Sequence, residues 1–163
     1  MNGEFRVILA LFVTILSGCH DGSAGRKTDG LVQASKDTIE PVVNSEQAAR
    51  TFPFDLSESG GKYTIVAQIE GKDLYPKYYR LFKKYGYNGN GYCWEGHIQQ
   101  ILEKKDNQLL KHIDFDSEAG MFAADADSKE AQQKFVEILS PIFSDLTVLS
   151  KWVKKADHSR IDD

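Results

Sequence analysis

The chain has few cysteines and no excess of basic residues. Only Cys19 and Cys93 occur among its 163 residues, and 20 Lys and Arg stand against 24 Asp and Glu, which gives a formal net charge of −4. Binding to the phosphate backbone of a nucleic acid requires a basic face, which a mildly acidic chain does not offer by default. We therefore expect no nucleic-acid partner.

Sequence motifs for common catalytic and cofactor sites are also missing. The Gly-x-Ser-x-Gly pattern of a serine nucleophile does not occur. No histidine cluster suits zinc, because His97, His112 and His158 fall on different expected elements. The glycine-rich segment 86–91 lacks the Lys-Ser/Thr pair of a phosphate-binding loop and follows a helix, so it is better explained as a helix–helix connection. We expect no cofactor and no metal.

Long hydrophobic runs are limited to one, at residues 7–16. This largely apolar run is shorter than the about 20 residues needed to span a bilayer. Arg6 precedes it, and Leu16-Ser17-Gly18-Cys19 follows it. A basic residue, a short apolar core and small residues at the end are typical of a secretory signal peptide. The last four residues resemble the lipobox of bacterial lipoproteins, which are cut before the cysteine and acylated on its thiol. We predict a signal peptide over residues 1–18 and a lipid on Cys19.

A lipid on Cys19 would fix the location and the redox chemistry of the protein. Two or more acyl chains anchor a protein stably to a membrane, and no later segment is apolar enough to span one. We therefore expect a membrane-anchored lipoprotein of the cell envelope, exposed outside the cytoplasm. Cys93 would then have no partner for an intramolecular disulfide. Residues 19–50 have little apolar periodicity and are interpreted as the lipidated cysteine and a flexible tether, with a short helix weakly indicated near residues 45–50.

The remaining segment, residues 51–163, is predicted to be the folded domain. Alternating apolar residues predict strands over 52–56 and 63–70, joined by the turn Ser59-Gly60-Gly61. Helical spacing predicts helices over 74–85 and 92–105, with a short helical piece near 107–111. A second hairpin is expected from strands 113–116 and 122–126 around the turn 117–120.

Two more helices complete the predicted domain. Asp127 is expected to cap the first of them together with Glu130, and Pro141 is expected to interrupt it or open a new turn. The second runs over residues 146–153, and the polar residues 157–163 are expected to fray. The order of elements predicts an α+β fold: a small antiparallel sheet built from two hairpins, with helices packed on one face.

Cys93 and His97 are the candidate pair for nucleophilic catalysis. They are four residues apart on an expected helix and so share a face, which allows a thiolate and a base to meet. Cys93 also adjoins Trp94 in an apolar context, where cysteine usually behaves as a small hydrophobe. Core packing is the favoured interpretation, and a cysteine-dependent enzyme is the alternative.

The second hairpin carries an uninterrupted set of acidic residues. Five acids and no base occur from residue 114 to 127. An EF-hand fits poorly because Gly120 falls at the seventh position of a loop begun at Asp114, instead of the sixth. A solvated strand face and an acidic patch that attracts a basic partner both remain open. Aromatic residues crowd positions 52–94, and most of them are expected in the core, although surface tyrosines often anchor interfaces. The candidate partner-binding residues are Tyr92, Trp94, Glu95, Asp114, Asp116, Glu118 and Asp125.

Several phrases of the sequence together resemble a known family. They are Gly89-Asn90-Gly91-Tyr92-Cys93-Trp94-Glu95-Gly96-His97-Ile98 and His112-Ile113-Asp114-Phe115-Asp116-Ser117-Glu118-Ala119-Gly120-Met121-Phe122, followed by Ala126-Asp127-Ser128 and Lys155-Ala156-Asp157. Over roughly residues 60–163 the chain resembles the immunity protein 51 family of bacterial polymorphic-toxin systems. The resemblance implies an α+β protein that protects its producer by binding and neutralising a cognate protein toxin, without a catalytic residue or cofactor. The alternative is an envelope lipoprotein that binds a small ligand or has a structural role.

Overall fold

A computed structural model describes residues 45–162 of the chain. The predicted signal peptide, Cys19 and most of the predicted tether lie outside these residues. Within them, no helix is both long enough and apolar enough to cross a membrane. The elements are α1 (Ser45–Thr51), β1 (Asp55–Ser59), β2 (Lys62–Gln68), α2 (Tyr75–Lys84), α3 (Gly91–Lys105), η1 (Leu109–His112), β3 (Ile113–Phe115), β4 (Met121–Ala126), α4 (Lys129–Phe143), α5 (Leu146–Val153) and η2 (His158–Arg160), where η marks a short 3₁₀ helix.

The four strands form one antiparallel sheet in the order β1-β2-β4-β3. Each hairpin pairs its own two strands, and β2 of the first pairs with β4 of the second. Gly60 and Gly61 form the first turn, with positive φ angles of 59° and 82°. Glycine adopts such angles readily because it has no Cβ. The predicted α+β fold with a sheet of two hairpins is confirmed.

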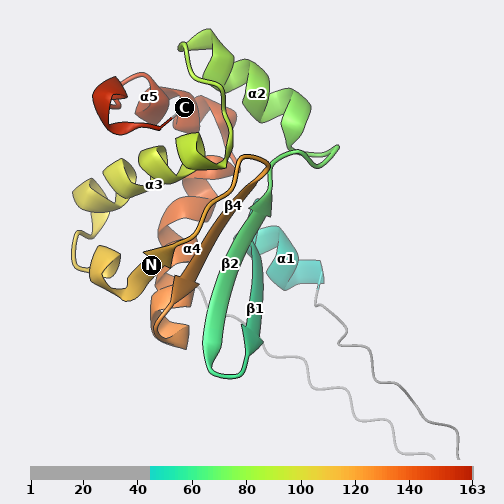
Figure 1. The fold of residues 1–163 in the computed structure, drawn as a ribbon. Coiled ribbons are helices and arrows are strands. Elements are labelled where there is room, and N and C mark those ends of the chain that lie inside the picture. Colours follow the sequence, from blue (N-terminus) through green and yellow to red (C-terminus); the bar gives the residue numbers. More distant parts are fainter. Residues whose placement is uncertain (1–44, 163) are drawn as a thin grey trace, which may run out of the picture. The chain divides into compact units, whose positions relative to one another are not determined.

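The helices cover one face of this sheet. Helix α3 contacts β4, α4 contacts β2 and β4, and α1 contacts β1; in Figure 1, α4 passes behind β4. The strand residues that face them are apolar and buried: Ile65, Ala67, Phe122 and Ala124 are at most 2% exposed. They alternate with residues on the opposite, outer face, as the period of two in a strand requires.

Phe54 lies at the centre of the core. Its ring makes edge contacts with Trp94, Phe122, Phe135 and Phe143, at centroid distances between 5.5 and 6.5 Å. These partners come from α3, β4 and α4, so a single side chain joins both layers of the fold. Edge-to-face geometry is a favoured arrangement of aromatic rings.

Buried polar side chains tie helix α4 to the first hairpin and to α1. The Gln132 amide donates hydrogen bonds to the carbonyls of Ser57 (3.1 Å) and Thr64 (2.8 Å), and Ser140 Oγ donates to the Thr51 carbonyl (2.8 Å). The short helix indicated near residues 45–50 is therefore present as α1, and its last residue is bonded to α4. Strand β1 begins at Asp55 and not at residue 52, because α1 extends to Thr51 and the N–H groups of Phe52 and Phe54 bond back to the Ala48 and Thr51 carbonyls.

Two predictions about α4 are wrong. Its N-cap is Ser128, whose Oγ accepts from the Ala131 N–H, and not Asp127. The Asp127 carboxylate is instead bonded to His112 Nδ1 at 2.7 Å. The helix also continues through Pro141 to Phe143. Pro141 lies on the exposed side near the helix end, where the loss of one backbone hydrogen bond is best tolerated.

The prediction that residues 157–163 fray is also wrong for the part of the segment that the structure describes. Gln100 and Asp157 exchange two hydrogen bonds, of 3.0 and 2.7 Å, between side chain and backbone. Arg160 forms a two-point ion pair with Glu103. Ile161 is 8% exposed and packs on Gly96, where an added Cβ would lie only 3.0 Å from the Ile161 side chain. The segment is therefore docked on α3.

Candidate partner-binding surface

The outer face of the sheet carries most of the candidate partner-binding acids. Asp114 on β3 lies directly opposite Asp125 on β4, and Asp125 lies opposite Thr64 on β2. Thr64 Oγ1 donates a 2.6 Å hydrogen bond to Asp125, and Lys62 Nζ lies 3.6 Å from the other oxygen of that carboxylate. Asp125 is part-buried, and Lys62 partly offsets the negative charge of its carboxylate. Asp114, in contrast, is exposed.

We define the acidic edge of the sheet as Asp114, Asp116 and Glu118. No basic side chain among the described residues offsets its negative charge. All three side chains are exposed, and no hydrogen bond or ion pair from the described residues reaches their carboxylates. The Asp116 N–H bonds the Ala123 carbonyl, and Glu118 is bridged to Met121, which keeps the pairing of β3 with β4 going beyond Phe115. Like charges gathered on one edge raise the rate at which a basic partner arrives.

Tyr92 is placed beside the turn of the acidic hairpin. The Gly91 N–H donates to the Ala119 carbonyl at 3.0 Å, and Asn90 caps α3 by accepting from the Cys93 N–H at 2.8 Å. A Cβ on Gly91 would lie 1.9 Å from the Glu118 carbonyl oxygen, so only glycine allows this approach. The Tyr92 side chain is 42% exposed and is available to a partner.

The other two candidates on α3 differ from Tyr92. Trp94 is 0% exposed and contacts Tyr78, Phe82 and Phe143, so it cannot be a contact residue and belongs to the core. Glu95 is part-buried and accepts a 3.0 Å hydrogen bond from Gln99.

Cys93 and His97 are both inside the protein, at 0% and 1% exposure. His97 packs against the rings of Phe82 and Tyr87, with centroids 5.1 and 4.6 Å away, and its Nε2 has no hydrogen-bond partner among residues 45–162. Burial, helped by the charge of His158, lowers the pKa of His97 from 6.5 to about 4. A neutral, enclosed imidazole and an enclosed thiol are not open to a substrate. This agrees with the core interpretation of the pair.

The glycine-rich segment 86–91 connects α2 with α3, as expected. Gly86 and Gly89 have positive φ angles of 87° and 74°. A Cβ on Gly89 would lie 3.1 Å from the Phe82 Cβ, so the loop folds closely over the end of α2. Among residues 45–162, no group of three or more His, Cys, Asp or Glu side chains is arranged to hold a metal ion.

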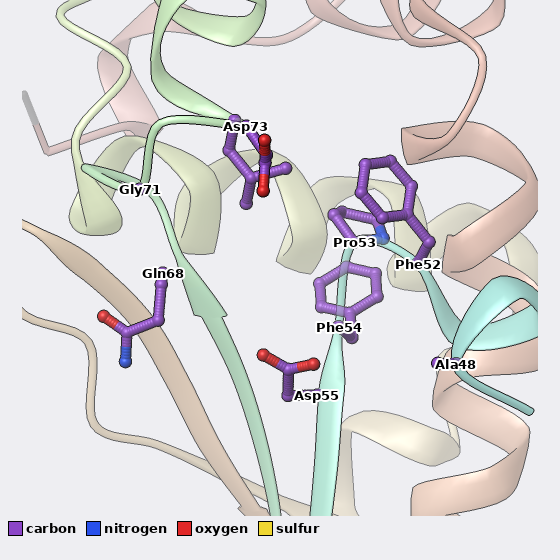
Figure 2. A pocket seen from close by; sticks show the side chains of 9 residues that line it. Ala48, Phe52, Pro53, Phe54, Asp55, Gln68, Gly71 and Asp73 are labelled. Carbon is purple, nitrogen blue, oxygen red and sulfur yellow. The ribbon is translucent and has the colours of Figure 1, made fainter. Parts of the chain in front are cut away.

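A cavity that sequence reasoning missed opens between α1 and the top of the first hairpin. Its volume is about 280 Å³. Figure 2 shows Asp73 above the opening, Asp55 below it, Gln68 on one side, and Phe52 and Pro53 on the other. Asp55 is the first residue of β1, and Asp73 lies in the segment between β2 and α2. No local pattern indicates this site, because two distant segments have to meet before it exists.

The described domain thus belongs to the class of two-layer α+β proteins with an open, acidic sheet face. A model of the family described as immunity protein 51 matches residues 63–158, more than half of the chain. The chain therefore belongs to the immunity protein 51 family. Comparisons with curated proteins and with solved structures give no match. The matched region runs from β2 to the start of η2 and includes the acidic edge, Tyr92 and the buried face of α3.

Proposed function

We propose that this protein is a lipid-anchored immunity protein that binds a cognate bacterial toxin and neutralises it by stoichiometric protein–protein contact. The observation that carries the proposal is membership of the immunity protein 51 family over residues 63–158. A binding mechanism is supported by the open acidic face, and by the burial of Cys93 and His97 away from any substrate.

The acidic edge and Tyr92 are the proposed contact surface. Asp114, Asp116 and Glu118 present exposed carboxylates that no described cation pairs. Tyr92, held at their end by the Gly91–Ala119 hydrogen bond, supplies a large ring of the kind that often dominates interface energies. An aromatic anchor beside uncompensated charge suits a toxin with a basic surface.

The lipid anchor restricts where the toxin is met. A protein held at a membrane surface by acyl chains on Cys19 can neutralise only a toxin that reaches that surface from outside the cytoplasm. Incorporation of labelled palmitate into the wild type, and its loss in Cys19→Ala, is the expected result. An unlipidated Cys19→Ala protein that still protects from the cytoplasm would contradict this part of the proposal.

Co-expression tests the function itself. A candidate toxin, taken from the genes that flank this one, is expressed in a sensitive host with and without this protein. We expect growth only when the immunity protein is present. Equal killing in both cultures, with the protein confirmed by immunoblot, would refute the proposed function.

A further inference from the structure

We infer that the cavity between α1 and the first hairpin receives an arginine or lysine side chain of the protein partner. This inference rests on the proposed function, because it takes that partner to be the toxin. The cavity would then be a second contact site for the toxin, besides the acidic edge, and it would bind a basic side chain.

The two carboxylates at the cavity give it a negative charge that no described group offsets. Asp55 and Asp73 are exposed, neither carboxylate has a hydrogen-bond or ion-pair partner among the described residues, and no Lys or Arg lines the cavity. They face the opening from two sides (Figure 2). A cation that enters the cavity is attracted by both carboxylates.

Apart from Asp55, Asp73 and Gln68, the side chains that line the cavity are apolar. Phe52 is 40% exposed and is one of three large hydrophobic side chains in the described residues with such exposure. With Pro53 and Leu74 it forms a surface along which the methylene stem of a basic side chain can lie, with the charged head in reach of the carboxylates. The Phe52 ring can also attract the cation directly.

The size of the cavity favours one side chain over a whole small-molecule ligand. Its volume of about 280 Å³ lies just below the usual range for drug-sized ligands, about 300–1,000 Å³. Gln68 lines the rim, where its amide nitrogen donates to Met121 Sδ at 3.1 Å and so holds the side chain against β4.

The Asp55 side chain and the acidic edge lie on the same face of the sheet. Asp55 is opposite Val66, Val66 is opposite Ala123, and the Asp116 N–H bonds the Ala123 carbonyl. Asp55 and Asp116 therefore lie at opposite edges of one row of the sheet, about 14 Å apart at the spacing of neighbouring strands. A basic partner that covers the outer face can reach both.

The test uses argininamide as the probe, with citrullinamide as its control, because citrullinamide has the same α-ammonium group and a nearly isosteric side chain without the guanidinium charge. The purified full-length protein in zwitterionic detergent is titrated while the backbone amides of Gly71 and Asp73 and the side-chain amide of Gln68 are followed by NMR. We expect saturable shifts with argininamide, none with citrullinamide, and roughly tenfold weaker binding for Asp55→Asn/Asp73→Asn. Asp114→Asn/Asp116→Asn, which removes the same charge elsewhere on the face, is expected to leave argininamide affinity within about twofold.

Several results would overturn the inference. They are the absence of saturable shifts, equal response to citrullinamide, and unchanged affinity in the Asp55/Asp73 variant. If the same amides shift when the protein alone is concentrated, the occupant of the cavity is a second copy of the protein. If argininamide binds only after Arg26→Gln and Lys27→Gln, the occupant is the N-terminal segment of the chain itself. The co-expression assay does not depend on this titration, so protection by a wild type that fails to bind argininamide would refute the cavity proposal and leave the proposed function standing.

Discussion

The two faces of the sheet are built from the same strands and have opposite chemistry. Ile65 and Ala124, opposite each other on the inner face, are at most 2% exposed and pack under the helices, whereas Thr64, Asp125 and Asp114 form a polar row on the outer face. The period of two separates them residue by residue. Stability should therefore depend on one face and recognition on the other. The predictions below test that separation, from the largest expected effect to the smallest.

Phe54 and Phe52 give the sharpest contrast between inside and outside. Phe54 is 1% exposed and contacts four aromatic rings, while Phe52 is 40% exposed. We expect Phe54→Ala to lower the free energy of unfolding by about 3–5 kcal/mol. Phe52→Ala is the matched control and should change it by about 0.5 kcal/mol or less. Urea denaturation followed by tryptophan fluorescence measures both, and equal losses would contradict the assignment of the core.

Gly91 is where α3 meets the acidic hairpin. We expect Gly91→Ala to destabilise the protein by about 3 kcal/mol, because the new Cβ would lie 1.9 Å from the backbone oxygen of Glu118. Gly120→Ala is the control, since its Cβ would meet only the flexible end of the Glu70 side chain, at 3.0 Å. The same denaturation experiment compares them. A Gly91→Ala protein as stable as the Gly120→Ala protein would show that α3 does not approach the hairpin this closely.

His97 makes the stability of the inner region dependent on pH. Its pKa is about 4 in the folded protein and 6.5 in an unfolded chain, so between these values the unfolded chain binds a proton that the folded protein does not. Stability contributed by neutral His97 is present above pH 6.5 and is lost as the pH falls toward 4, by about 2–3 kcal/mol. Denaturation midpoints measured from pH 7 to 4 should fall less steeply for His97→Phe than for the wild type. Parallel curves would exclude His97 as the source.

The acidic edge should affect binding and leave stability alone. Asp114→Asn/Asp116→Asn is expected to shift the free energy of unfolding by about 0.5 kcal/mol or less, because neither carboxylate has a described partner. It should slow association with the cognate toxin by roughly tenfold at low salt. Stopped-flow association rates at two salt concentrations provide the measurement. A rate equal to that of the wild type at low salt would show that the toxin contacts a different surface.

Local pattern predicted the elements of this fold well and their long-range contacts poorly. Alternation identified the second hairpin and the solvent face of Asp114 and Asp116, because a strand period depends only on neighbouring residues. Trp94 was proposed as a contact residue because helical spacing alone does not reveal how many sides of α3 are covered. Helix α3 is enclosed by β4, α4, α5 and Ile161, and the contact with Ile161 depends on a segment expected to fray.

Competition between hydrogen-bond partners explains another difference between the predicted and the observed structure. Asp127 is a good N-cap residue in isolation, but His112, fifteen residues earlier, takes its carboxylate and leaves the cap to Ser128. Local pattern does not reveal the cavity for a related reason, since Asp55 and Asp73 line one cavity only when the first hairpin and the segment before α2 are in place.

The most direct test of the central claim is a titration of the purified cognate toxin with this protein, with the toxin's own activity as the readout. Neutralisation by binding predicts a linear loss of toxin activity that ends at one equivalent, and a complex of the two chains on size-exclusion chromatography. Complete loss of activity at a small fraction of an equivalent, or full activity at a large excess, would contradict neutralisation by stoichiometric contact.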